Sequence, residues 1–265
     1  MRDYKIEVEN RVEFIRGALQ SAGANGVVFG NSGGKDAALV GILCKMACEN
    51  TVGIIMPCKA AQNYGSDKSD AEILAAQFEI ETRVVDLTAT RDEIISSIEG
   101  SPKARMGSAG SADPNDGHRN ELYNRNLTDS ALSNIAPRLR MTTLYAIAAS
   151  ENLLVAGTGN KSERFMGYFT KWGDGAFDFN PVADLTVTEV FEFLRYLGAP
   201  AGIIDKAPSA GLFEGQTDEA DMGVTYAAID EYLESGKAND HDRTIIERYH
   251  RTSEHKRRLP PMFGG

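Results

Sequence analysis

The chain has 265 residues and a formal net charge of −10, and 42% of its residues are hydrophobic. This hydrophobic content supports a buried core and excludes global disorder, whereas the acidic balance argues against a nucleic-acid partner. With three cysteines and no long apolar run, we expect no disulfide framework, no signal peptide, no membrane contact and a cytoplasmic protein.

Strand and helix patterns alternate through the first hundred residues. Helices are predicted at 3–20, 35–49, 67–78 and 91–98, and strands at 26–30, 51–57 and 82–87. In the helix at 67–78 we expect Ile73 and Leu74 to face inward. The alternation predicts βαβ units in a doubly wound, Rossmann-like α/β fold, with a parallel sheet flanked by helices.

The pattern is interrupted at about 100–127, where small and polar residues predict a flexible surface insertion; a lid that orders over substrate is the alternative. The second half then contains one further strand and several helices. They are predicted at 129–150 (helix), 152–157 (strand), 186–197, 225–234 and 242–254 (helices). We find no repeat and interpret residues 1–265 as a single domain.

The order of the strands predicts where a ligand binds. If the first three strands build outward on one side, the fourth lies on the other side of the first strand and creates a switch point. Open α/β sheets bind ligands there, at the carboxyl ends of the strands. The turns Gly30–Asp36 and Thr158–Glu163 would then face each other across a crevice.

The first of these turns has the composition of a phosphate-binding loop. A Walker A loop is excluded because Phe29 stands where it needs a glycine and Asp36 where it needs Ser or Thr. A dinucleotide fingerprint is excluded because Ser32 stands at its second glycine. The remaining S-G-G-K-D is the pattern of ATP pyrophosphatases; an ordinary glycine turn between strand and helix is the alternative.

The two turns also carry candidate metal ligands. Asp36 and Glu163 supply carboxylates that could share one Mg²⁺ with the phosphates of ATP. Each residue has another explanation: Asp36 as a first-turn acid that complements the helix dipole, and Glu163 as the partner of Asn160 in a capping box.

Five blocks in the same order resemble the ammonia-dependent NAD⁺ synthetases of the ATP pyrophosphatase superfamily. They are S-G-G-K-D (32–36), R-L-R-M (138–141), G-T-G-N-K-S-E (157–163), G-Y-F-T-K-W-G-D-G-A-F-D-F-N-P (167–181) and T-S-E-H-K-R-R-L-P-P (252–261). The resemblance implies an adenine nucleotide α-hydrolase-like fold. It also implies a reaction in which ATP adenylates the carboxylate of deamido-NAD⁺, releasing pyrophosphate, and ammonia then forms the amide of NAD⁺ with release of AMP.

The resemblance also implies roles for particular residues. Carried onto this chain, the ATP-binding residues are Gly30, Asn31, Ser32, Gly33, Gly34, Lys35, Asp36, Ala37, Thr158, Val187 and Ser209. The residues that contact deamido-NAD⁺ are Arg138, Lys171, Asp178, His255 and Lys256. Asp36 and Glu163 are implied to hold Mg²⁺ and, with Lys171, to be catalytic. Taken singly, the basic residues would be surface charges and Asp178 a turn residue. The resemblance further implies a homodimer, and because no cysteine stands out as a glutaminase nucleophile we expect free ammonia as the nitrogen donor.

Three departures from the family pattern lie on the ATP side. Ala37 replaces a serine, Val187 stands where we expect a lysine that reaches the phosphates, and Gly211 replaces an acid. Three functions therefore stay open: an NAD⁺ synthetase in which Lys35 or Lys161 replaces the lost lysine, an amide ligase for another carboxylate, and a weakly catalytic paralogue that binds a dinucleotide.

Overall fold

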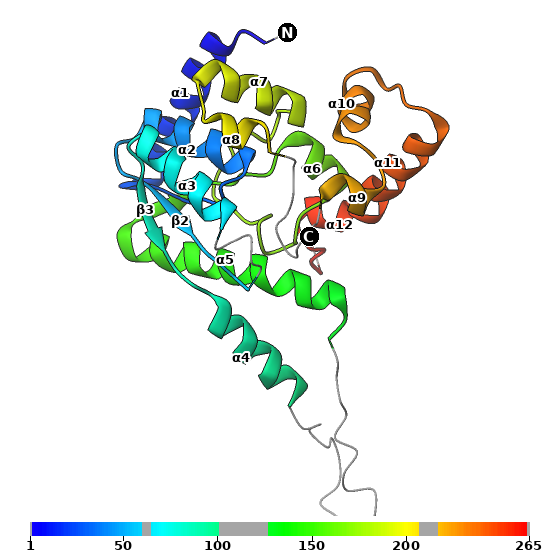
Figure 1. The fold of residues 1–265 in the computed structure, drawn as a ribbon, viewed down its shortest axis with the longest axis horizontal. Coiled ribbons are helices and arrows are strands. Elements are labelled where there is room, and N and C mark those ends of the chain that lie inside the picture. The colour runs from blue at the N-terminus through cyan, green and yellow to red at the C-terminus, as the bar shows by residue number, and fades with distance from the viewer. Residues whose placement is uncertain (1, 60–64, 101–126, 207–216, 264–265) are drawn as a thin grey trace, which may run out of the picture.

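A parallel β-sheet of four strands forms the centre of the computed structural model, which describes residues 2–59, 65–100, 127–206 and 217–263 (Figure 1). The strands are β1 (Gly26–Gly30), β2 (Thr51–Ile55), β3 (Glu81–Val84) and β4 (Leu153–Val155), and their order is β3-β2-β1-β4. β1 pairs in parallel with β2 in the register Val27 to Thr51 and with β4 in the register Gly26 to Leu153. The predicted doubly wound α/β fold and its strand order are therefore confirmed.

The helices follow the predicted sequence, with short additions in the second half. They are α1 (Tyr4–Ala22), α2 (Lys35–Ala47), α3 (Ser66–Gln77), α4 (Thr88–Glu99), α5 (Asp129–Glu151), α6 (Lys161–Met166), α7 (Val187–Leu197), α8 (Ala201–Ile204), α9 (Asp218–Met222), α10 (Tyr226–Ser235), α11 (Asp240–Thr252) and α12 (Glu254–Arg257). Their ends follow the expected local chemistry. α7 begins with a capping box between Thr186 and Glu189 and ends at Gly198, which has a φ of 71°.

Helices cover both faces of the sheet because the side chains of a strand alternate between its faces. From β1, Val27 and Phe29 enter a core shared with α1, α2 and α7, which we call the first core. Val28 points the other way, into a core completed by α5, where Ala148 is buried. Figure 1 shows α5 on one side of the sheet and α1, α2 and α7 on the other.

A third hydrophobic core lies away from the sheet, beneath α6, α7, α9, α10 and α11. Its buried residues are Met166, Val187, Met222, Val224, Tyr226, Ile229 and Ile246. Helix α7 belongs to two cores, because Val190 and Phe193 pack into the first core while Val187 packs into the third.

One prediction about packing is wrong. On α3, Leu74 is fully buried as expected, but Ile73 is 50% exposed, since neighbouring helix positions point about 100° apart. The predicted insertion at 100–127 lies almost wholly outside the described residues. None of the described helices has the length and apolar character needed to cross a bilayer.

Candidate active site

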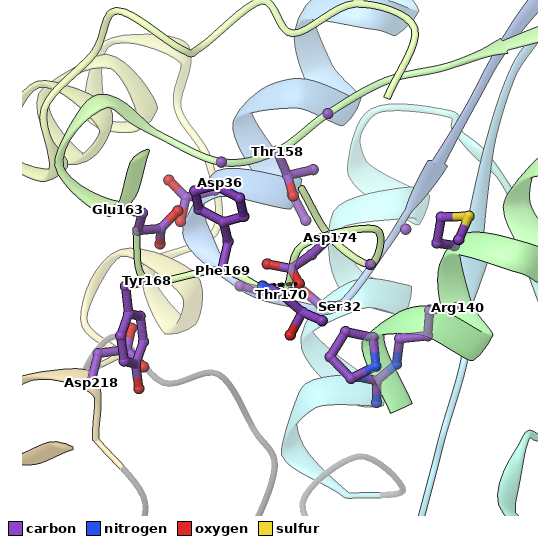
Figure 2. Close-up of a pocket in the computed structure, with 18 of the residues that line it drawn as sticks. Ser32, Asp36, Arg140, Thr158, Glu163, Tyr168, Phe169, Thr170, Asp174 and Asp218 are labelled. Atoms are coloured by element: carbon purple, nitrogen blue, oxygen red, sulfur yellow. Dashed lines mark hydrogen bonds between the residues drawn. The ribbon is translucent and has the colours of Figure 1, made fainter. Parts of the chain in front are cut away.

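A cavity with a volume of ≈ 880 Å³ opens at the predicted switch point, a size typical of ligand pockets. Its described lining comes from the carboxyl ends of β1, β2 and β4, the first half of α5, most of residues 166–176, and the C-terminal helices. The loops after β1 and β4 both face into it, as the strand order predicts. Figure 2 shows Asp36 and Glu163 together in one part of the cavity and Arg140 in another.

The loop after β1 is shaped to approach a ligand with its backbone. Gly33 has a φ of 74°, and a Cβ atom there would lie 2.1 Å from the carbonyl oxygen of Asp67, so a side chain does not fit. Helix α2 starts directly after Gly34, and no side chain among the described residues caps it. Its first backbone N–H groups and the positive end of its dipole are therefore available to an anion such as a phosphate.

The carboxylates of Asp36 and Glu163 are joined by a fully buried asparagine. Asn160 Nδ2 donates to Asp36 Oδ1 at 3.0 Å, and Asn160 Oδ1 accepts from the backbone N–H of Glu163 at 3.0 Å. The backbone N–H of Asn160 donates in turn to Glu163 Oε2 at 3.1 Å, which completes a capping box at the start of α6. The capping role considered for Glu163 is thus present, and the same contacts orient its carboxylate beside Asp36.

A buried lysine lies beside both carboxylates. Lys35 Nζ lies 2.7 Å from Asp36 Oδ2 and 3.8 Å from Glu163 Oε1. Burial alone would lower the pKa of Lys35, but the attraction of Asp36 and Glu163 outweighs it and raises that pKa, so the side chain is a cation. Glu163 is affected in the opposite sense: burial, together with the charge of Asp36, raises its pKa to about 8.

The donor set fits a magnesium ion. Carboxylate oxygens are ligands that Mg²⁺ prefers, and the ion commonly takes one or two of them from the protein and completes its shell with phosphate oxygens and water. The described residues contain no group of three or more His, Cys, Asp or Glu able to hold a metal alone. Burial is the main cause of the raised pKa of Glu163 and the charge of Asp36 adds to it; a dication held by both carboxylates would stabilise their ionised forms.

Basic residues connect α5, the segment after α6 and α12. Arg138 Nε donates to the carbonyl oxygen of Lys171 at 3.4 Å, and Lys171 Nζ donates to that of His255 at 2.7 Å. Lys256 Nζ donates to the carbonyl oxygen of Phe169 at 2.7 Å and lines the cavity.

Comparison with known proteins identifies the family. The NAD synthase family model matches residues 7–260. The chain belongs to the NAD synthase family. It is 44% identical over 261 residues to the NH3-dependent NAD(+) synthetase of Carboxydothermus hydrogenoformans, covering 98% of each chain. The structure of the NMN synthetase of Francisella tularensis is similar with a TM-score of 0.86 and 33% identity, and that of the NH3-dependent NAD synthetase of Campylobacter jejuni with 0.74 and 27%; each match covers 99% of both chains.

The structure brings most of the predicted ATP-binding residues of this family member into the cavity. Its lining contains Gly30, Asn31, Ser32, Gly34, Lys35, Asp36, Ala37 and Thr158. Gly33 shapes the loop, as described above. Val187 lies elsewhere: its side chain is 3% exposed and belongs to the third core. Ser209 and Gly211 lie outside the described residues. The assigned roles remain predictions.

The predicted substrate-binding residues are divided. Lys256 lines the cavity, whereas Arg138, Lys171, Asp178 and His255 are absent from its described lining. Asp178 supports the sheet, because its Oδ2 accepts from the backbone N–H of Val155 at 2.8 Å and its Oδ1 from the hydroxyl of Tyr145 at 3.3 Å.

Sequence reasoning missed Arg140 and Asp218. Both line the cavity: Arg140 donates to the carbonyl oxygen of Met56 at 3.1 Å, and Asp218 is 4% exposed and accepts from the hydroxyl of Tyr226 at 3.0 Å. A signal for Arg140 was present in the helical period, because Pro137 and Leu144 line the cavity at spacings of three and four residues from it. No comparable signal pointed to Asp218.

Proposed function

We propose that this protein is an ATP-dependent ligase that converts the carboxylate of deamido-NAD⁺ to the amide of NAD⁺ with ammonia. The observation that carries the proposal is the meeting of Asp36 and Glu163 from the turns after β1 and β4, beside an open helix N-terminus in a large cavity. Family membership and 44% identity over nearly the whole chain support the same reaction.

The chemistry requires alignment and charge stabilisation more than proton transfer. A carboxylate oxygen of the substrate attacks the α-phosphorus of ATP, and the bond from that phosphorus to the β-bridging oxygen breaks, so that pyrophosphate leaves. Ammonia then attacks the acyl carbon, and AMP leaves with the bonding electron pair while the nitrogen loses a proton. In our proposal the turn after β1 and the first N–H groups of α2 hold the phosphates. Asp36 and Glu163 would hold Mg²⁺, which supplies neutralisation of charge on the leaving pyrophosphate.

Basic side chains of the cavity would hold the phosphates of the second nucleotide. Lys256, predicted from the family pattern, and Arg140, found in the structure, both line the cavity. We propose that these two contact the substrate directly. Arg138 contacts Lys171 and Lys171 contacts His255, and these contacts would position Lys256 and residues 170–174.

A second candidate function differs in the substrate. The similarity to the NMN synthetase of Francisella tularensis, with a TM-score of 0.86, exceeds that to the NAD synthetase of Campylobacter jejuni, with 0.74. This observation favours an amide ligase that acts on the corresponding mononucleotide, nicotinate mononucleotide. The family and the adenylation chemistry are the same in both cases.

A substrate panel tests both functions. Pyrophosphate release is measured with ATP, Mg²⁺ and ammonium, with either deamido-NAD⁺ or nicotinate mononucleotide, and the amide product is quantified by chromatography. We expect a higher kcat/KM with deamido-NAD⁺; a higher value with the mononucleotide establishes the second function. Absence of turnover with both refutes these two functions and leaves an amide ligase for another carboxylate or a protein that only binds nucleotides. Glutamine in place of ammonium tests the nitrogen donor.

Two capping acids provide a matched test of the metal role. Glu163 and Glu189 occupy the same capping-box position at the starts of α6 and α7, but Glu189 is outside the described lining of the cavity. Glutamine preserves a capping box. We therefore expect Glu163→Gln to lower kcat at least tenfold and to raise the Mg²⁺ concentration needed for half-maximal rate. Glu189→Gln should change neither, and equal effects of the two would refute the metal role.

We also propose that the protein is cytoplasmic and that two copies of it form a homodimer through α4 and α5. None of the 12 residues of α4 is buried, and this described helix contacts α5 while projecting from the rest of the chain (Figure 1). A helix without a buried residue is suited to pack against a second chain. Light scattering after size exclusion should give twice the mass of one chain, and Ile98→Glu on α4 should reduce the measured mass to that of one chain.

A further inference from the structure

The ammonium group of Lys35 contacts two acids of the site and is attracted by a third. The side chain of Lys35 is 6% exposed, and its Nζ contacts Asp36 and Glu163 at the distances given above. The nearby carboxylate of Asp218 adds a further attraction. The rings of Tyr226 and Phe191, whose centroids lie 5.5 and 6.0 Å from Nζ, close the other side. The cation is thus held by carboxylates and aromatic faces together.

The ammonium of Lys35 lies against oxygens of both carboxylates that a metal ion would need as ligands. A dication bound by Asp36 and Glu163 would lie between their oxygens, within a few ångströms of Lys35 Nζ as it stands. Two cations at such a separation, shielded from water, repel strongly. Lys35 and Mg²⁺ therefore compete for the same pair of carboxylates.

The chain offers the lysine a second place. Lys35 is the first residue of α2 and follows the glycine loop directly. Its flexible stem of four carbons can therefore carry the ammonium from the acids to an anion at the start of α2. Without an anion there, leaving the carboxylates would strand a buried charge without a partner, which is costly. With a polyphosphate in place, both cations have partners.

We propose that Lys35 is the resident counter-ion of the Asp36–Glu163 pair, which blocks Mg²⁺ until a nucleotide arrives and then transfers its ammonium to the polyphosphate. This inference rests on the proposed ATP and metal site. Its consequence is a binding order imposed by charge: Mg²⁺ alone binds weakly, and Mg²⁺ and ATP bind cooperatively. The coupling is reciprocal, so each strengthens the other by the same factor.

The test measures Mg²⁺ binding without nucleotide or substrate. Lys35→Met keeps an unbranched apolar stem against Tyr226 and Phe191 and removes the charge. By calorimetry, we expect Lys35→Met to bind Mg²⁺ alone at least tenfold more tightly than the wild-type protein, with a larger Mg²⁺-induced rise in Tm. The control is Lys45→Met. It removes from the same helix a charge that pairs with Glu49, and it should leave Mg²⁺ binding unchanged.

Three outcomes decide the proposal. Equal or weaker Mg²⁺ binding by Lys35→Met overturns it, and so does an equally large gain in Lys45→Met. If Lys35→Met does not fold, Lys35→Gln supplies the same measurement with a neutral, polar stem. The double variant Lys35→Met/Asp36→Asn should lose the tight binding; if it retains it, the metal is held elsewhere and the inference fails. None of these results depends on turnover, so failure of the ligase function in the substrate panel remains distinguishable.

Discussion

Replacing Asn160 by alanine should remove the contact that links Asp36 to the start of α6. The side chain of Asn160 is 0% exposed and makes two contacts, with Asp36 Oδ1 and with the backbone N–H of Glu163, each at 3.0 Å. Loss of an N-cap side chain costs about 1 kcal/mol. Loss of a buried hydrogen bond to a charged group costs about 1.5–3 kcal/mol. The free energy of unfolding should therefore fall by about 2.5–4 kcal/mol.

The two contributions can be separated with a second variant. Serine keeps an oxygen that caps α6 but has no amide group to donate to Asp36, so Asn160→Ser should lose about 1.5–3 kcal/mol. The assay is urea unfolding of the three proteins without Mg²⁺ or nucleotide, because either ligand would add its own stabilisation. A loss below about 0.5 kcal/mol in Asn160→Ala, the range of ordinary surface substitutions, would refute the reasoning. Equal losses in both variants would refute the assigned contribution of the cap, and an Asn160→Ser variant as stable as the wild-type protein would refute the assigned role of the bond to Asp36.

Two further predictions concern the glycine loop and the basic residues. Gly33→Ala should lower the free energy of unfolding by more than about 2 kcal/mol and abolish ATP binding, because its Cβ would collide with backbone. The control is Gly198→Ala, which has a φ of 71° but open space around it and should cost about 1 kcal/mol in the same urea assay. Equal losses would contradict the steric argument. Arg140→Ala should raise the KM of the nucleotide substrate roughly tenfold or more, because it removes a charge-assisted contact inside the cavity, and Arg138→Ala should raise it less than about threefold. Steady-state kinetics would show the reverse order if Arg138 holds the substrate.

Much of the fold could be predicted because the relevant signals are local. Each strand is a short apolar run and each helix a periodic segment, so the order of elements follows from neighbouring residues. The rule that parallel strands are joined through helices then leaves few arrangements, of which β3-β2-β1-β4 is one. The limits of the elements were less accurate: β4 spans Leu153–Val155 within a predicted strand at 152–157, since pairing with β1 decides where a strand ends.

The candidate site could be predicted in part, for the same reason. The loop Gly30–Ala37 is contiguous, and its glycines and acid are visible in the sequence. The contact between Lys35 and Glu163 and the approach of Asp218 depend on how distant segments pack, which spacing does not reveal. Val187 shows the same limit: its place in a motif predicted a position at the phosphates, and the structure buries its side chain in the third core.

The two acids of the site lie on helices that pack into different hydrophobic cores. Asp36 stands on α2, whose buried face belongs to the first core with β1, while Glu163 stands on α6, which packs on α10 and α11 in the third core. Helix α7, with Val187 in one core and Phe193 in the other, is a shared wall between them. The separation of the two acids therefore depends on how the first and third cores pack against α7. A substitution on that helix would therefore change the separation of Asp36 and Glu163, although α7 is outside the described lining of the cavity.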